Sequence, residues 1–178
     1  MKRLILTYGI IGGAIAAAWC NIGVRALPDN VSQDTQMWLG YTSMIVAFSM
    51  IFIAVKNYKD KFGSGYITFG KALKIGLLIT LVASTLYVAM WLISYYFIFP
   101  NFMEKYMATL KAQMQAAGKS SAVINREMAA MAKYNEAYKN PFLNAMITYS
   151  EIVPVGIIIS LIAALILKSN SKPAIVNV

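Results

Sequence analysis

Four long apolar segments restrict the folds that this sequence can adopt. They cover residues 4–24, 37–55, 75–99 and 142–167, and the first three contain no charged residue. An α-helix rises about 1.5 Å per residue, so the shortest segment reaches roughly 28 Å, against a hydrocarbon core of about 30 Å. The composition agrees, because 59% of the residues are hydrophobic, only 13% are charged and the mean hydropathy is +0.60. We therefore predict an all-α integral membrane protein with four transmembrane helices.

Lysine and arginine are distributed unevenly around these segments. The N-terminal tail, the connection 56–74 and the C-terminal tail are basic, whereas the first connection has only Arg25 beside Asp29 and Asp34. By the positive-inside rule, both termini and the 56–74 loop are predicted to be cytoplasmic. The chain then divides into residues 1–99 with spans 1 to 3, residues 100–140 outside, and residues 141–178 with span 4 and a cytoplasmic tail.

The outer segment, 100–140, carries apolar side chains at helical spacing. They recur every three or four residues, as Met103, Tyr106, Leu110 and Met114, and again as Ile124, Met128, Met131, Tyr134 and Tyr138. Gly118 is suited to end a first helix, and Ser120 or Ser121 to begin a second. Asn140 and Pro141 are suited to cap and begin the last span. We predict an extracytoplasmic helical hairpin whose apolar stripes pack on each other or on a partner.

Few residues are suited to catalysis or metal binding. The chain has no histidine, and its one cysteine, Cys20, cannot form an internal disulfide, so we interpret it as a small buried side chain. A cuprous ion held by the methionines of 103–131 is an alternative, but helix packing explains them better. Gly70-Lys71-Ala72 lacks the pattern of a phosphate-binding loop. We predict no catalytic residue, no metal, no cofactor and no nucleic-acid partner.

Five lysines of the 56–74 loop form a basic cluster. Near an anionic leaflet, each basic residue contributes about 1 kcal/mol of attraction. We interpret the cluster as a determinant of topology that contacts anionic lipid headgroups, with a specific regulatory lipid site as the alternative. Its members are Lys56, Lys59, Lys61, Lys71 and Lys74.

Several stretches are similar to a known family. They are VKNYKDKFGSGYITFGKALKIGLLITLVASTLYV, then FPNFMEKY and KNP, and finally EIVPVGIIISLIAALILK. They resemble an uncharacterised bacterial membrane-protein family, a domain of unknown function found mostly in Bacteroidota. The resemblance covers most of the chain and implies a four-span protein of the bacterial inner membrane with an outer helical insertion. It implies no known activity and no catalytic residue.

Small residues recur every four positions in the first and last segments. Such faces let helix backbones approach closely in lipid, where they drive association. We predict that these two helices pack on each other or form a seam between two copies of the chain. The residues are Gly9, Gly13 and Ala17, and Gly156, Ser160 and Ala164.

A polar stripe occupies another side of the last segment. Asn144, Thr148 and Glu151 are spaced by four and three residues, about 140° round the helix from Gly156. Pro154 has no N–H to donate to the Ser150 carbonyl, so we expect a kink there.

Glu151 is the one charged residue in the four segments, and we place it near the bilayer midplane. Because no lysine or arginine is available at that depth, we expect its carboxyl to stay protonated. We predict that it donates a hydrogen bond to Tyr87 or Thr42.

Two functions are compatible with these features. The first is a non-enzymatic anchor or accessory subunit that presents residues 102–138 to an envelope protein or a second copy, with Glu151 as a neutral clamp between helices. The second is a small proton- or ion-coupled transporter or channel subunit that uses Glu151. The absence of histidine and of paired acids favours the first function. A polar cavity that reaches Glu151 would favour the second.

Overall fold

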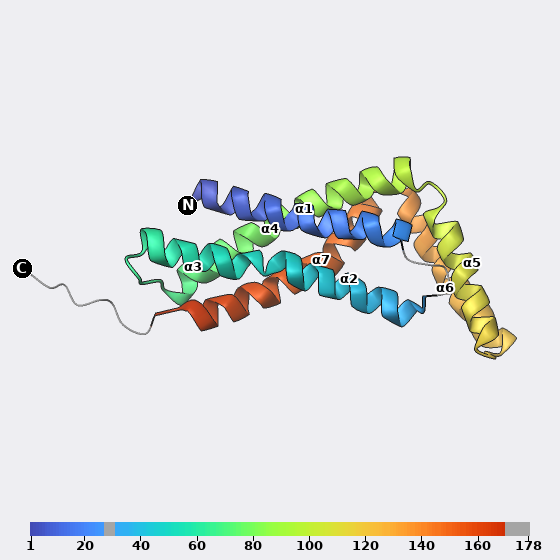
Figure 1. Cartoon of the computed structure of the whole chain (residues 1–178). Helices are drawn as coiled ribbons and strands as arrows, with labels where there is room; N and C mark the ends of the chain where they lie inside the picture. Colours follow the sequence, from blue (N-terminus) through green and yellow to red (C-terminus); the bar gives the residue numbers. More distant parts are fainter. Residues whose placement is uncertain (27–30, 170–178) are drawn as a thin grey trace, which may run out of the picture.

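A computed structural model of the chain describes residues 1–26 and 31–169, and these contain helices and no strands. Figure 1 shows long helices side by side, with a shorter pair, α5 and α6, across one end of the bundle. The elements are α1 (Lys2–Ala26), α2 (Gln33–Phe48), α3 (Met50–Phe62), α4 (Phe69–Ile93), the π-helix η1 (Ser94–Ile98), α5 (Phe102–Ala116), α6 (Ser121–Lys139) and α7 (Pro141–Leu167).

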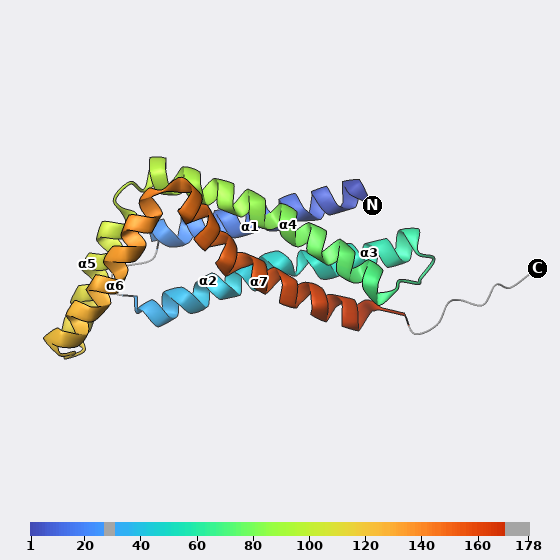
Figure 2. The ribbon, with the colours of Figure 1, turned by 180° about the vertical axis from the view of Figure 1, so that it is seen from behind.

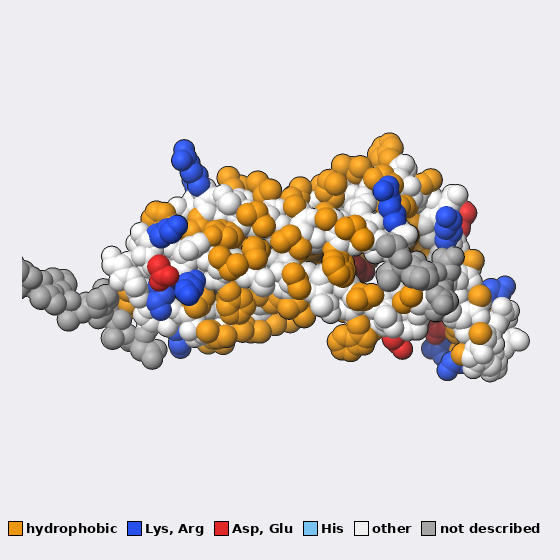
Figure 3. Space-filling view, in the orientation of Figure 1, with side chains coloured by type: hydrophobic (Ala, Val, Ile, Leu, Met, Phe, Trp, Pro, Cys, Tyr) orange, Lys and Arg blue, Asp and Glu red, His pale blue; other side chains and the backbone are white. Residues whose placement is uncertain are grey.

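Four stretches of the described chain are long and apolar enough to cross a membrane. Figure 3 shows hydrophobic side chains along the bundle and basic side chains gathered towards its two ends. The predicted all-helical protein with four spanning helices is confirmed at this level. The stretches are Lys2–Arg25, Asp34–Phe62, Phe69–Ile98 and Pro141–Leu167.

The second stretch is interrupted at Ser49, between α2 and α3. The Ser49 hydroxyl donates to the Val46 carbonyl at 2.6 Å, and the Ser49 N–H is shared between the carbonyls of Ile45 and Val46. A serine hydroxyl that bonds a preceding carbonyl competes with the helical pattern and often bends a helix. The second span therefore has a local break, which hydropathy alone did not predict.

α4 lies against both α1 and α7. A Cβ added to Gly13 would lie 2.8 Å from the Ala83 carbonyl oxygen, and one added to Gly9 would lie 2.6 Å from Val82. On α7, a Cβ at Gly156 would collide with the Thr80 side chain. Within the chain, both small-residue faces thus approach α4 closely, whereas we expected them to pack on each other or to form a seam between two copies. The other small residues of these faces, Ala17, Ser160 and Ala164, are buried.

Side-chain hydrogen bonds also join α4 to α7. They occur at three levels along the two helices, so the contact is polar as well as closely packed. The pairs are Thr80 with Ser160 at 3.2 Å, Tyr149 donating to Thr85 at 3.0 Å, and Trp91 donating to Asn144 at 3.1 Å.

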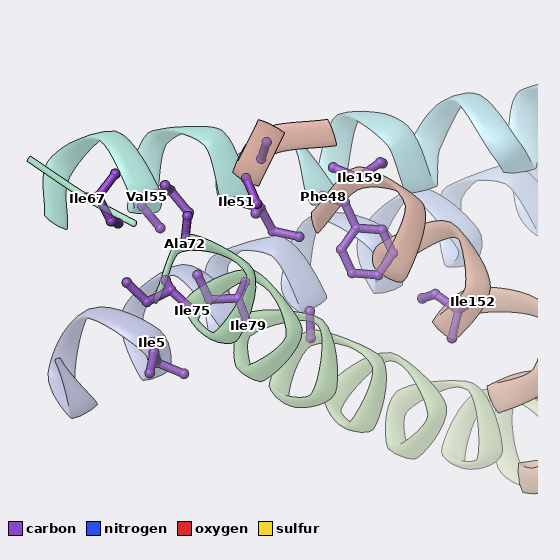
Figure 4. Packing of buried hydrophobic residues seen from close by; sticks show 14 residues of the cluster. Ile5, Phe48, Ile51, Val55, Ile67, Ala72, Ile75, Ile79, Ile152 and Ile159 are labelled. Atoms are coloured by element: carbon purple, nitrogen blue, oxygen red, sulfur yellow. The ribbon is translucent and has the colours of Figure 1, made fainter. Parts of the chain in front are cut away.

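The apolar core lies in the half of the bundle next to the α3–α4 loop. Figure 4 shows Ile51 and Phe48 facing Ile75 and Ile79 of α4, with Ile159 of α7 close by. All of them are at most 8% exposed. The end of α7 is tied to the same loop, because the Ser169 N–H donates to the Ile67 carbonyl at 2.9 Å. This half of the bundle is closed by tight packing.

α5 and α6 contact each other at the opposite end of the bundle. Gly118 has φ +67° just after α5, and the Ser120 hydroxyl accepts from the Val123 N–H at the start of α6. Asn140 caps α7 by accepting from the Phe142 N–H at 2.9 Å, and Pro141 is the first residue of that helix. The predicted starts and stops of these helices are therefore confirmed.

Several side chains of the apolar stripe of α5 and α6 are buried by contacts within the chain. Met103, Leu110 and Ile124 are buried. The α5–α6 pair is also bonded to the bundle, because the Tyr96 hydroxyl donates to the Tyr138 carbonyl at 2.6 Å and the Gln113 amide donates to the Val31 carbonyl at 3.0 Å. The pair is docked on the bundle over several contacts.

Candidate functional site

Two adjoining cavities lie where α5 and α6 meet the spanning helices. The first, which we call the Glu151 cavity, has a volume of about 450 Å³. Residues from α1, α4, α5, α6 and α7 line it, so the α5–α6 pair covers it from one side. The lining residues are Cys20, Val24, Tyr87, Trp91, Phe102, Met103, Tyr106, Met131, Tyr134, Tyr138, Thr148 and Glu151.

The second cavity, which we call the Arg25 cavity, has a volume of about 610 Å³ and lies between α1, α2 and the start of α5. Arg25, Lys105 and Gln36 are among its lining residues. The Arg25 guanidinium lies over the Phe99 ring, 5.5 Å from its centre. The two cavities share part of their walls, so they are neighbours. The shared residues are Cys20, Val24, Tyr87, Phe102 and Tyr106.

Glu151 lies closer to the first residue of α7, at the α5–α6 end, than to the last. At 1.5 Å per residue it is about 15 Å from the first residue of α7 and about 24 Å from the last. Its side chain is exposed in the isolated chain and lines the cavity. Within the described residues, the carboxyl has no hydrogen-bond or ion-pair partner. The group is therefore available to a ligand.

The hydrogen bond that we predicted from Glu151 to Tyr87 or Thr42 is not formed. The Tyr87 hydroxyl lies 3.7 Å from the Cys20 sulfur and donates to it, although Tyr87 lines the same cavity as Glu151. Thr42 is exposed on α2 and is not part of the cavity wall. The position of each residue along its helix predicted that Thr42, Tyr87 and Glu151 lie in one layer. The rotation of α2 about its own axis, however, directs Thr42 away from the cavity.

The polar stripe of α7 divides into two parts. Asn144 is fully buried, and its side-chain oxygen accepts from the Trp91 indole at 3.1 Å and from the Thr148 hydroxyl at 3.3 Å. Asn144 thus joins α7 to α4, whereas Thr148 and Glu151 line the cavity. Pro154 lies inside the helix, and Figure 2 shows that α7 is bent.

An aromatic cluster surrounds the cavity, and the amino-acid sequence does not reveal it. The rings of Trp91 and Phe102 meet edge to face with centres 5.3 Å apart, and those of Tyr95 and Tyr138 lie 5.6 Å apart. Burial raises the pKa of the Tyr138 phenol far above its usual value, and the nearby Glu151 raises it further. Tyr138 therefore contributes a neutral aromatic ring to the wall. The helical spacing of the tyrosines on α5 and α6 was visible in the sequence, but not their common target.

The basic cluster lies at the other end of the bundle. Lys59 donates to the Leu167 carbonyl at 3.2 Å, and the Lys71 ammonium lies 5.6 Å from the centre of the Tyr58 ring. Lys56, Lys61 and Lys74 are exposed. In the part of the chain that the structure describes, no three His, Cys, Asp or Glu side chains are grouped to hold a metal ion.

Four apolar spans, a tightly packed half and a cavity beneath α5 and α6 define a multi-pass, all-helical membrane protein. The chain belongs to the family described as "Protein of unknown function (DUF4199)", whose family model matches residues 7–169. The resemblance to a family of unknown function is thereby confirmed, and the family description names no activity. No match was found among curated proteins or among solved structures.

Proposed function

We propose that this protein is a small proton- or cation-coupled transporter, or the membrane subunit of one, with Glu151 as the charged group of its solute site. The observation that supports this proposal most directly is the cavity of about 450 Å³ that reaches a carboxyl without a partner among the described residues. An ionisable side chain within a spanning helix is costly, and such residues commonly mark ion or substrate paths.

The packing on either side of the cavity is consistent with a transporter open towards one end. On the side of Glu151 that faces away from α5 and α6, the apolar core closes the helix bundle. A Cβ added to Gly156 there would lie 2.9 Å from the Phe48 ring. The two helix irregularities, at Ser49 and Pro154, lie next to Phe48 and Gly156 in the chain. Discontinuous helices recur at transporter binding sites, and such points can act as hinges.

The charge distribution supports the orientation. The end with the α3–α4 loop carries the five lysines together with Lys2 and Arg3, whereas the α5–α6 end mixes acidic and basic residues. We propose that the lysine end contacts the anionic cytoplasmic leaflet of a bacterial inner membrane, and that α5 and α6 form a hairpin outside it.

The anchor function, which we favoured from the sequence, has less support from the geometry than the transporter. An anchor that presents residues 102–138 to a partner needs an apolar face directed outward. Met103, Leu110 and Ile124 are instead buried, and Tyr106 and Tyr138 line the cavity. The proposed role of the α5–α6 pair is to cover a site within the chain, and the proposed activity is non-enzymatic.

Proton flux in liposomes tests this proposal. The purified protein is reconstituted with an internal pH-sensitive dye, and a potassium diffusion potential drives proton entry. We expect faster acidification than in protein-free liposomes, and a loss of that flux in Glu151→Gln. The matched control is Glu127→Gln, an exposed carboxyl on α6, which should retain the flux. Flux equal to that of protein-free liposomes, or unchanged in Glu151→Gln, would refute proton coupling through Glu151.

A further inference from the structure

We propose that the Glu151 cavity binds an organic ammonium group, held by the Glu151 carboxylate and the surrounding aromatic rings. This inference rests on the proposed function, because it names the chemical class of ligand for the same site. The ammonium group can belong to a free amine or to the headgroup of a lipid in the leaflet beside α5 and α6.

The composition of the cavity wall supports a cation with an apolar shell. Aromatic side chains come from three helices: Tyr87 and Trp91 from α4, Phe102 and Tyr106 from α5, and Tyr134 and Tyr138 from α6. The face of an aromatic ring attracts a cation within about 6 Å of its centre, by about 0.5 kcal/mol at exposed sites and about 2 kcal/mol or more where water is excluded. Quaternary ammonium groups are commonly recognised by such cages.

The charged residues of the cavity wall also favour a cationic ligand. Glu151 is the one acidic residue among the described residues that line this cavity, and no lysine or arginine is among them. Arg25 and Lys105 line the neighbouring cavity. The carboxyl that we expect to be protonated in the empty site ionises more readily when a cation binds beside it. An anionic ligand would oppose that ionisation, and a neutral apolar ligand would leave the group unpaired. A cation compensates it.

A metal cation fits the wall less well than an ammonium group does. Calcium and magnesium take six or more oxygen ligands, including carboxylates and carbonyls. Besides the Glu151 carboxyl, α7 contributes to this wall one hydroxyl, that of Thr148, which already donates to the Asn144 carbonyl at 2.9 Å. An ammonium group with methyl or methylene substituents needs one carboxylate and apolar or aromatic contacts, which this wall supplies.

The size of the cavity sets a limit on the ligand. Its volume of about 450 Å³ lies in the lower part of the range of small-molecule pockets, about 300–1,000 Å³. A small amine or a single headgroup fits within it.

Choline and its uncharged isostere 3,3-dimethylbutan-1-ol test the inference. The protein is placed in nanodiscs of phosphatidylglycerol, which has no ammonium group, and each compound is titrated by calorimetry at constant ionic strength. We expect choline to bind about tenfold more tightly than the isostere, in line with the cation–π energies above. In Glu151→Gln this preference should disappear.

A second variant removes one ring and keeps the carboxylate. Tyr134 is half exposed on α6, so Tyr134→Leu should leave the fold intact, which its circular dichroism and thermal midpoint will check. We expect this variant to weaken choline binding more than binding of the isostere. Equal binding of the two compounds by the wild type, or a preference unchanged in folded Glu151→Gln, would overturn the inference.

A third arm distinguishes the two sources of the ammonium group. Nanodiscs that also contain phosphatidylethanolamine should weaken the apparent choline affinity if the site takes a lipid headgroup, and leave it unchanged if the site takes a free amine. Either result agrees with an ammonium site. Choline binding without proton flux would retain this inference and refute proton coupling, whereas flux without a preference for choline would do the opposite.

Discussion

Replacement of Gly13 by alanine tests whether α1 packs directly against the backbone of α4. The new Cβ would lie 2.8 Å from the Ala83 carbonyl oxygen, 3.0 Å from the Leu86 Cβ and 3.1 Å from the Ala83 Cα, where ordinary contact begins at 3.4 Å. Because two of these atoms belong to the backbone, no rotamer change relieves the overlap. α1 must therefore move away from α4 by about half an ångström, which weakens every contact along the interface.

Gly40→Ala is the matched control, because a Cβ there meets no atom within 4 Å. Alanine is favoured over glycine in a helix by about 1 kcal/mol, and this gain applies to both variants. Overpacking costs about 1–3 kcal/mol and applies to Gly13→Ala alone. The difference between the variants thus isolates the cost of the close contact.

Thermal unfolding followed by circular dichroism in a mild detergent measures this difference. At about 2–4 °C per kcal/mol for a protein of this size, Gly13→Ala should unfold roughly 5 °C below Gly40→Ala. An equal or higher midpoint for Gly13→Ala would show that α1 does not pack on α4 as the structure has it.

Two further predictions concern the polar contacts and the basic end. Trp91→Phe removes the indole donor to the buried Asn144. It should lower the free energy of unfolding by about 1 kcal/mol, as measured by chemical unfolding. An unchanged unfolding midpoint would contradict a structural role for this hydrogen bond. Replacing the five lysines by glutamine should weaken retention of a peptide of residues 56–74 on vesicles rich in phosphatidylglycerol, with little change on neutral vesicles. Equal loss on both kinds of vesicle would contradict an electrostatic origin.

The sequence predicted the helices and their ends well, because these depend on local features. Hydropathy over 19 or more residues located the four spans, and Gly118 and the Asn140–Pro141 pair located helix ends. Each of these signals operates within one turn or one span. The break at Ser49 was missed because a serine in an apolar run does not reveal whether its hydroxyl bonds a preceding carbonyl.

The site was predicted in part, because its chemistry is local and its geometry is tertiary. A carboxyl on a polar stripe identified Glu151, but helix depth could not determine which residues face it. Tyr87 is in the cavity wall, whereas Thr42 is not, since the rotation of each helix decides this. For the same reason, the spacing of Gly9 and Gly156 predicted close packing without identifying α4 as the partner.

The central claim is that water reaches Glu151 beneath the α5–α6 pair, and cysteine labelling at this position tests it most directly. Glu151→Cys is introduced with Cys20→Ser, so that the native cysteine of the wall does not react. Ile158→Cys in the same background is the control, because Ile158 is on the exposed apolar surface of α7. A membrane-impermeant trimethylammonium thiol reagent is added to vesicles from the α5–α6 side. We predict rapid labelling at position 151 and none at 158; labelling at 151 no faster than at 158 would contradict the account.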